Sequence, residues 1–262
     1  MKTAFLIIDA QYDFCNPNGA LFVPGAVEDM QRLSQLVSRN LDKIDAIYAT
    51  LDTHPVNDIS HPSFWAGADG QPPAPFTMIT AADVTAGRWR PLHESEKVLQ
   101  YLQQLEAQGE FTHLIWPEHC LHGSRGAALD DTLLEALRRF AHTGREYRTV
   151  VKGTHPLTEH FGIFQAQVPV PDALETQLNT PLLQELAQFD RVYLCGEAKS
   201  HCVATSLKQV MTHAPALARK MVIVQDTMSD VTGLGHLGDP IYAEARQRGI
   251  AFVTAAEAEA QL

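Results

Sequence analysis

Residues 192–203, with the sequence VYLCGEAKSHCV, could carry a nucleophile. The apolar run at 192–194 is typical of a strand that breaks at Gly196, and a helical pattern begins near Ser200. Cys202 would then lie at the start of a helix, where free backbone N–H groups and the helix dipole favour a thiolate and can hold an oxyanion. The alternative is that Cys202 is a small buried hydrophobic residue, a common role for a free cysteine.

Charged side chains stand at the ends of other apolar segments. Asp9 follows the run at 4–8, and Lys152 follows the run at 147–151. Because the C-terminal ends of parallel strands share one edge of a sheet, these side chains could meet Cys202 there. An aspartate can accept the thiol proton and a nearby ammonium lowers the thiol pKa, which is chemistry suited to attack on a carbonyl carbon and release of an amine or ammonia. The alternative for Asp9 and Lys152 is an ordinary salt bridge at a sheet edge.

A possible metal site is formed by Asp52 and His54, which follow the apolar run at 46–51, together with His119, which follows the run at 112–116. One carboxylate and two imidazoles suit zinc, iron or manganese. Three other histidines could replace the third ligand: His61, His93 and His113. Without a third ligand, Asp52 and His54 would be a capping acid and a surface histidine.

Strand-like and helix-like segments alternate along the chain. Apolar runs of strand character occur at 4–8, 46–51, 112–116, 147–151, 192–194, 221–225 and 250–253. Helical patterns occur at 26–41, 94–107, 129–140, 181–187, from 200 onward and at 241–248. This alternation predicts an α/β fold: a single three-layer α/β/α domain over residues 1–262, with a mostly parallel sheet of about six strands. Residues 55–93 lose the pattern and are expected to be a long inserted loop region that serves as a lid or a partner surface.

Composition narrows the class of partner. The chain of 262 residues has 31 acidic and 20 basic side chains, a formal net charge of −11, which argues against nucleic acid and anionic membranes as partners. The four cysteines, Cys15, Cys120, Cys195 and Cys202, show no metal-binding or disulfide spacing. The apolar run after Lys2 meets a charge at Asp9 and is too short for a signal peptide, and no run reaches the ~20 apolar residues of a membrane helix, so we expect neither. We expect a cytoplasmic protein.

Five ordered motifs resemble those of nicotinamidases, which belong to the isochorismatase-like cysteine hydrolase superfamily. The motifs are LIIDAQYDF at 6–14, DTHP at 52–55, WPEHC at 116–120, KG at 152–153 and GEAKSHCV at 196–203. The resemblance runs from the first strand to the last and is interrupted mainly by the region 55–91.

The resemblance implies a role for each matched residue. Asp9, Lys152 and Cys202 would be the catalytic triad, and the backbone N–H groups of Ala198 and Cys202 would form the oxyanion hole. Asp52, His54 and His119 would bind a divalent metal ion, zinc before iron or manganese. Phe14, Trp116 and Gln11 would bind the substrate, the two aromatic rings enclosing a flat ring. A cis peptide between Ala198 and Lys199, a homo-oligomer and a place in NAD salvage are also implied.

The resemblance predicts an amidohydrolase that converts nicotinamide and water to nicotinate and ammonia through a cysteine thioester. Several positions depart from the usual pattern, namely Asp58, Phe161, Glu197 and Lys199, so the exact amide stays open. One alternative is a relative that acts on a carbamoyl or ureido compound of the N-carbamoylsarcosine or ureidoacrylate type. Another is a catalytically quiet member that uses its insertion for binding or assembly.

Overall fold

A six-stranded parallel sheet forms the centre of the molecule, as a computed structural model describes it for residues 1–109 and 111–262. The strand order is β10-β9-β8-β1-β2-β7. The bounds are β1 Thr3–Ile8, β2 Ala46–Asp52, β7 Tyr147–Lys152, β8 Arg191–Gly196, β9 Met221–Val224 and β10 Ala251–Val253. The predicted α/β class and the parallel sheet are confirmed.

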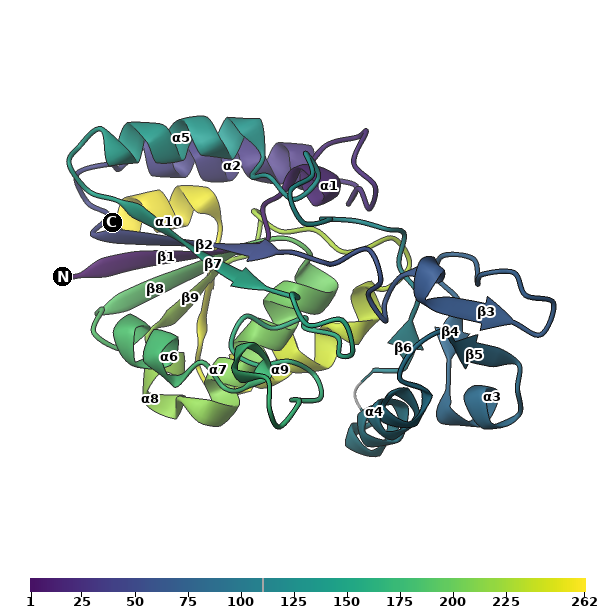
Figure 1. Ribbon diagram of the computed structural model, residues 1–262. Helices are drawn as coiled ribbons and strands as arrows, with labels where there is room; N and C mark the ends of the chain where they lie inside the picture. The colour runs from purple at the N-terminus through teal and green to yellow at the C-terminus, as the bar shows by residue number, and fades with distance from the viewer. Residues whose placement is uncertain (110) are drawn as a thin grey trace.

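Helices cover both faces of this sheet (Figure 1). One face carries α2 (Ala26–Arg39), α5 (Asp131–Ala141) and α10 (Ala255–Gln261), and the other carries α6 (Thr180–Leu186), α7 (Ala204–His213), α8 (Pro215–Ala218) and α9 (Asp239–Gln247). The helix α5 illustrates why these segments are helical. Asp130 caps the N–H groups of Thr132 and Leu133, and Leu133, Leu137 and Phe140 bury one face.

Strand register brings the predicted catalytic positions to one edge of the sheet. In the parallel ladders Ile8 is level with Gly196, and Asp52 is level with Lys152. Every residue of β1 is buried, as expected for a central strand covered on both faces. The C-terminal ends of β1, β2, β7 and β8 therefore lie together, and Asp9 follows β1 directly.

Residues 55–93 form part of a small ordered lobe rather than the expected long loop. The lobe contains η1 (Pro62–Phe64), β3 (Trp65–Gly67), β4 (Met78–Ile79), α3 (Ala81–Thr85), β5 (Trp89–Pro91), α4 (Ser95–Gln108) and β6 (His113–Leu114). It packs around its own hydrophobic cluster, which includes Phe64, Trp65, Val98, Leu102 and Ile115. Figure 1 shows the lobe beside the C-terminal ends of the central strands. Most of its elements are too short to produce a visible period in the sequence.

The apolar run at 112–116 does not join the central sheet, which corrects the sequence prediction. Its strand β6 instead pairs antiparallel with β4. Ile115 donates its N–H to Thr77 and Trp116 donates to Ser60, so the backbone of this run is committed to the lobe. An apolar run identifies a buried strand but not the sheet to which that strand belongs.

Outside the lobe, several segments match no predicted element, among them α10. The short helix α1 (Tyr12–Cys15) follows β1, and a 3-10 turn at Leu174–Thr176 precedes α6. Within the described ranges, no helix has both the length and the apolar character needed to cross a membrane.

Candidate active site and metal centre

Lys152 is the centre of the site. Its Nζ lies 2.9 Å from Asp9 Oδ2, 2.8 Å from Asp52 Oδ1 and 3.7 Å from Cys202 Sγ, and it donates to the backbone carbonyl of His160 at 2.9 Å. All these side chains are buried. The structure therefore brings together the three residues predicted to be catalytic, Asp9, Lys152 and Cys202.

The end of β1 and the neighbouring β2 hold Asp9 in place. Asp9 has a φ of 41°, a left-handed conformation that non-glycine residues adopt at a cost on the order of 1–3 kcal/mol. Thr50 on β2 accepts the Asp9 N–H at 2.9 Å and donates its hydroxyl to Asp9 Oδ1 at 2.5 Å. These two bonds fix the carboxylate so that its other oxygen faces Lys152.

The position after Lys152 has no room for a side chain, which accounts for Gly153. Its φ is 78°, and a Cβ atom built there would lie 2.6 Å from Asp52 Oδ1. Any side chain at this position would displace the carboxylate that pairs with Lys152.

Burial and charge set the protonation states of the three groups. Burial alone would lower the pKa of Lys152, but the carboxylates of Asp52 and Asp9 raise it well above its usual value, so the ammonium stays charged. Burial also raises the pKa of Asp9, against the opposing effect of Lys152.

Burial likewise raises the pKa of the Cys202 thiol well above its ordinary value. Lys152 opposes this rise, while Asp9, which accepts a hydrogen bond from the thiol, adds to it. The predicted effect of Lys152, a lowering of the thiol pKa, is therefore present, but burial is the largest influence and outweighs it. The raised pKa favours the neutral thiol, and Asp9 lies beside it as an acceptor for its proton.

The turn before Cys202 starts at a glycine that no other residue could replace. A Cβ at Gly196, where φ is 107°, would lie 2.0 Å from the carbonyl oxygen of Ile8. The chain continues through a cis peptide between Glu197 and Ala198, one residue earlier than the bond expected between Ala198 and Lys199.

Cys202 lies in a π-helical turn, η3 (Lys199–Val203), that runs directly into α7. The carbonyl of Ala198 accepts the N–H groups of His201 and Val203 at 3.1 and 3.2 Å. The predicted helix near Ser200 is thus present but opens with a wider turn, a form often found at functional sites.

Cys202 opens into a narrow cavity of about 30 Å³. The cavity is lined by Phe14, Leu21, Asp52, Trp116, His119, Glu159, Phe161, Ala198, His201, Cys202 and Val231. A volume of this size holds one or two water molecules, so a planar ring enters only when side chains of the lining move. Phe14 and Trp116 are both in the lining, as expected for walls that enclose a ring.

Gln11, the third residue predicted to bind substrate, is committed elsewhere and is not in the lining. Its side chain donates to the carbonyls of Asp52 and Ala127 at 2.7 and 2.9 Å and accepts the N–H of Asp52 at 2.8 Å. A glutamine in these contacts holds the end of β2 in position.

The two unusual charged residues of the turn also point away from the cavity. Lys199 pairs with Asp230 at 3.0 Å, and the carboxyl of Glu197 faces Ser229. Neither residue is in the cavity lining. Phe161, the other departure near this turn, does line the cavity, with its ring 5.3 Å from that of His201.

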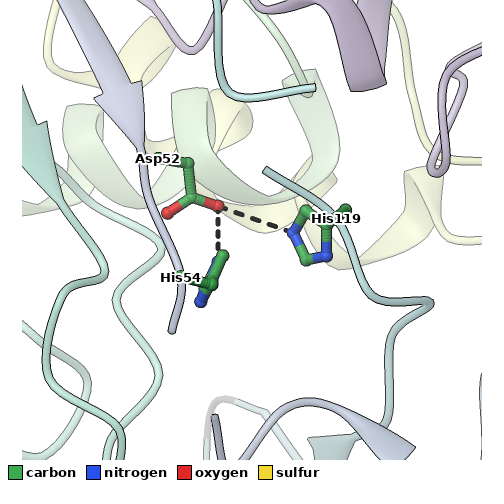
Figure 2. Close-up of side chains that lie close together, drawn as sticks. All are labelled: Asp52, His54 and His119. Carbon is green, nitrogen blue, oxygen red and sulfur yellow. Dashed lines mark hydrogen bonds and ion pairs between the residues drawn. The ribbon is translucent and has the colours of Figure 1, made fainter. Parts of the chain in front are cut away.

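Asp52, His54 and His119 converge as a possible metal centre (Figure 2). Their ligand atoms all lie within 4.8 Å of one another. Asp52 Oδ2 is 2.9 Å from His54 Nε2 and 3.6 Å from His119 Nε2. The three predicted ligands are therefore brought together.

Each histidine of this centre is oriented through its other ring nitrogen. His54 Nδ1 lies 3.0 Å from Asp58 Oδ2, and His119 Nδ1 lies 2.8 Å from the carbonyl of Pro117. Such outer partners fix the ring and leave Nε2 for a metal, so the set fits a divalent cation such as zinc.

The other histidines considered as ligands differ in position. The ring of buried His61 lies 5.2 Å from that of His54, and both His61 ring nitrogens lack a hydrogen-bond partner among the described residues. His113 instead contacts the carbonyl of Ile59 at 3.0 Å, and His93 is exposed. Only His61 therefore faces the centre.

Glu159 is a buried residue of the site that the sequence reasoning missed. It lines the cavity and accepts the indole N–H of Trp116 at 3.3 Å, and burial raises its pKa to about 8. It stands in an irregular stretch seven residues after Lys152, where neither periodicity nor a motif distinguishes a buried acid from a surface one. The orienting role of Asp58 was also missed, although its spacing of four from His54 was a usable signal.

Comparisons with known proteins find similarity to nicotinamidases. No family model matches the chain. A nicotinamidase from Saccharomyces cerevisiae is 25% identical over 226 residues, which cover 86% of this chain and 87% of that protein.

Solved structures give the same fold. Yeast nicotinamidase bound to the inhibitor nicotinaldehyde matches with a TM-score of 0.66 at 19% identity, covering 96% of this chain and 99% of that one. A nicotinamidase from Acinetobacter baumanii matches with a TM-score of 0.65 at 20% identity, covering 98% and 97%. A pyrazinamidase from Pyrococcus horikoshii, in complex with zinc, matches with a TM-score of 0.56 at 19% identity, covering 97% and 99%. The chain therefore has the α/β fold of these nicotinamidases and pyrazinamidases, and its sequence is similar to that of the yeast nicotinamidase.

Proposed function

We propose that this chain is a cysteine amidohydrolase that hydrolyses nicotinamide to nicotinate and ammonia. The observation that carries the proposal is the buried contact of Lys152 with Asp9 at 2.9 Å and with Cys202 at 3.7 Å, beside a cavity walled by aromatic rings. The similarity to nicotinamidases supports the choice of substrate.

The first step is proton transfer from the Cys202 thiol to the Asp9 carboxylate. Burial raises the pKa of Asp9, which makes this carboxylate a stronger base than an exposed one. Lys152 stays charged and stabilises the thiolate as it forms.

The thiolate then attacks the carboxamide carbon and a tetrahedral oxyanion forms. The backbone N–H groups of Ala198 and Cys202 are the proposed donors to this oxyanion, and Ala198 and Cys202 both line the cavity. Asp9 returns its proton to the departing nitrogen, the C–N bond breaks, and ammonia leaves behind a thioester on Cys202.

Water completes the cycle. Asp9, now ionised again, accepts a proton from a water molecule that attacks the thioester carbon. The C–S bond breaks, Asp9 returns this proton to the Cys202 sulfur, and the product leaves as nicotinate after its own acid proton passes to solvent. The same carboxylate therefore acts twice as base and twice as acid.

Asp52, His54 and His119 are the residues proposed to hold a divalent cation, zinc first. When bound, such an ion supplies a Lewis acid that can coordinate a ring nitrogen or a water molecule. The chain's own contribution is orientation, since Asp58 and the carbonyl of Pro117 fix the two imidazoles.

The test is ammonia release from nicotinamide by purified protein, compared with N-carbamoylsarcosine and ureidoacrylate at equal concentrations. The proposal requires hydrolysis of nicotinamide that Cys202→Ala abolishes. Preference for a ureido compound would move the protein to the alternative amidase class. A protein that turns over none of these compounds, although metal is bound, would be the quiet binding member. Cytoplasmic location, NAD salvage and a homo-oligomer remain predictions from the resemblance.

A further inference from the structure

Glu197 is a buried acid in the turn that carries Cys202, and the proposed mechanism does not use it. Its side chain has 0% exposure and its carboxyl points away from the cavity. Oε2 accepts the backbone N–H of Ser229 at 3.1 Å, and the Glu197 N–H donates to the carbonyl of Ile8 at 2.8 Å. A wholly buried carboxyl next to the catalytic turn requires an explanation.

Its neighbour is a second buried carboxyl, Asp29 of α2, which interacts with Glu197. No described group donates a hydrogen bond to Glu197 Oε1, so an ionised Glu197 would leave this buried oxygen without a partner. Arg32 donates to Asp29 Oδ1 at 2.7 Å, and the hydroxyl of Ser229 donates to Asp29 Oδ2. Glu197 forms no ion pair with any basic side chain in the part of the chain that the structure describes.

Two adjacent buried carboxyl groups cannot both be ionised without a large cost, so they share one proton. Asp29 has a guanidinium and a hydroxyl to stabilise its charge, whereas Glu197 accepts a single N–H. The proton therefore belongs on Glu197, which can then donate it to Asp29. Burial, followed by the charge of Asp29, raises the pKa of Glu197 well above its ordinary value, consistent with this assignment.

Ser229 links this acid pair to the catalytic turn. While its N–H and hydroxyl contact Glu197 and Asp29, its carbonyl accepts the N–H of Lys199 at 2.8 Å. Two residues on, Val231 donates its N–H to Ser200 Oγ at 3.2 Å. The loop at 229–231 thus contacts the turn on both sides of Ala198, whose N–H is a proposed oxyanion donor.

We propose that Glu197 is a positioning residue that, as a neutral carboxylic acid hydrogen-bonded to Asp29, holds the turn of Ala198 and Cys202 against α2 and the loop at Ser229. The catalytic consequence rests on the proposed function, but the neutral acid itself does not. The charged and titratable groups around Glu197 are Asp29 and Arg32 of α2, Cys15 of α1, Cys195 of β8, Lys199 of the turn, Asp230 of the loop and Tyr242 of α9.

The neutral acid can be tested without any substrate. In the unfolded chain Glu197 loses its proton above about pH 4.5, whereas in the folded chain it keeps the proton, so unfolding releases one proton. Between about pH 5.5 and pH 7.5 the unfolding equilibrium constant of the wild type, relative to that of Glu197→Gln, should rise about tenfold per pH unit. Urea unfolding at each pH measures this ratio.

Glu244→Gln is the matched control, because Glu244 is a surface residue paired with Arg248. The unfolding equilibrium constant of the wild type, relative to that of Glu244→Gln, should stay nearly constant over the same pH range. If the ratio of unfolding equilibrium constants for Glu197→Gln is also independent of pH, Glu197 is ionised in the folded protein. That result would overturn the proposal.

The positioning role is tested by activity and by rescue. Glu197→Val removes the bonds to Ser229 and Asp29 and should lower kcat at least about tenfold with a smaller change in KM. Glu197→Gln can make both bonds and should restore kcat to within about twofold of the wild type. Wild-type kcat in Glu197→Val, or equal losses in both variants, would refute the positioning role.

If Glu197→Val does not fold, the comparison of the wild type with Glu197→Gln still decides, since a Gln variant with a tenfold lower kcat contradicts a neutral hydrogen-bonding acid. If the wild type hydrolyses none of the amides, the proposed function fails, while the pH dependence of unfolding still reports on Glu197. The two proposals can therefore fail separately.

Discussion

At the scale of single residues, one ammonium group organises the site. Lys152 neutralises part of the charge of two carboxylates and still contacts the thiol, so it cannot lower the thiol pKa as far as an isolated lysine would. In the proposed mechanism the proton of Cys202 is therefore taken by a base at the moment of attack. This mechanism assigns to Asp9 the larger share of the activation.

Replacement of the nucleophile gives the first prediction. Cys202→Ala should fold normally and lose at least about 10³-fold in kcat, because no thioester can form. Cys195→Ala is the control, since Cys195 is buried in β8 and is absent from the cavity lining. Steady-state ammonia release measures both. Substantial turnover by Cys202→Ala would exclude covalent catalysis by this residue.

The pKa of the thiol gives a second prediction. Because burial raises the pKa of Cys202, the thiolate fraction is small near neutral pH and grows as pH rises. The rate of iodoacetamide labelling at Cys202 in the metal-free protein should therefore increase with pH, by up to about tenfold per unit below the pKa. Peptide mapping should find Cys202 labelled before Cys15, Cys120 and Cys195, which are less exposed. Labelling that is already fast and independent of pH would indicate a preformed thiolate.

Asp9 provides the third prediction. Asp9→Asn keeps the shape of the side chain but removes the base and the acid, and kcat should fall about 10²- to 10⁴-fold. Thr50→Val is a graded comparison, since it removes the two bonds that orient Asp9 without removing its charge. The fall in kcat of Thr50→Val should be smaller than that of Asp9→Asn. A larger fall in kcat for Thr50→Val than for Asp9→Asn would mean that Asp9 supports the structure of the site more than it transfers protons.

At the scale of secondary-structure elements, the C-terminal ends of the parallel strands determine the site. Apolar runs ending in Asp9, Asp52 and Lys152 were enough to predict that these side chains meet, because parallel register leaves few alternatives. The run at 112–116 was assigned to the wrong sheet, yet His119 still reaches the metal centre. The reason is that a β-bridge between His54 and Leu121 aligns the two segments.

The metal centre gives a prediction at this scale, because its ligands come from different segments and depend on outer partners. Asp58→Asn should weaken metal binding about 10- to 100-fold, since Asp58 orients His54. His142→Ala, on the exposed end of α5, should leave metal content unchanged. Metal analysis after dialysis against a graded chelator measures both. Unchanged affinity in Asp58→Asn would remove Asp58 from the centre.

At the scale of the whole molecule, the protein consists of a central sheet with its helices and a lobe with a separate hydrophobic cluster. Apart from α4, which matches the predicted helix at 94–107, the lobe was not predictable, since elements of two to five residues leave no period and their pairing is decided by tertiary contacts. The burial of Glu159, the contacts of Gln11 and the direction of the Glu197 side chain were not predictable either, because they depend on tertiary packing. Sequence motifs identify candidate functional residues, but the burial and the direction of a side chain can be known only from the three-dimensional structure.

The lobe carries an acid-sensitive group, His113. Burial lowers its pKa from 6.5 to about 4, so it is neutral when folded and takes up a proton when unfolded in mild acid. The unfolded state then binds more protons, and stability falls as pH drops from about 6.5 toward 4. At about pH 5 this loss amounts to about 2 kcal/mol.

His113→Phe should reduce the loss of unfolding free energy between about pH 7 and pH 5 by that amount. Urea unfolding followed by tryptophan fluorescence measures it, because Trp65 and Trp89 lie in the lobe. His142→Ala is the control for an exposed histidine. An equally steep loss in His113→Phe would mean that His113 is charged in the folded protein.

The two oxygens of Asp52 have different partners: Oδ1 contacts Lys152, and Oδ2 faces the imidazoles. Removal of a metal ion with a chelator and replacement of Asp52 are therefore different experiments on this protein. If the proposed ion is bound, its removal leaves both carboxylates beside Lys152 in place, whereas replacement of Asp52 removes an ion ligand and also one of the two carboxylates that pair with Lys152. A metal-free wild type and an Asp52 variant should consequently differ in residual activity, and that difference isolates the share of Asp52 that has nothing to do with the ion.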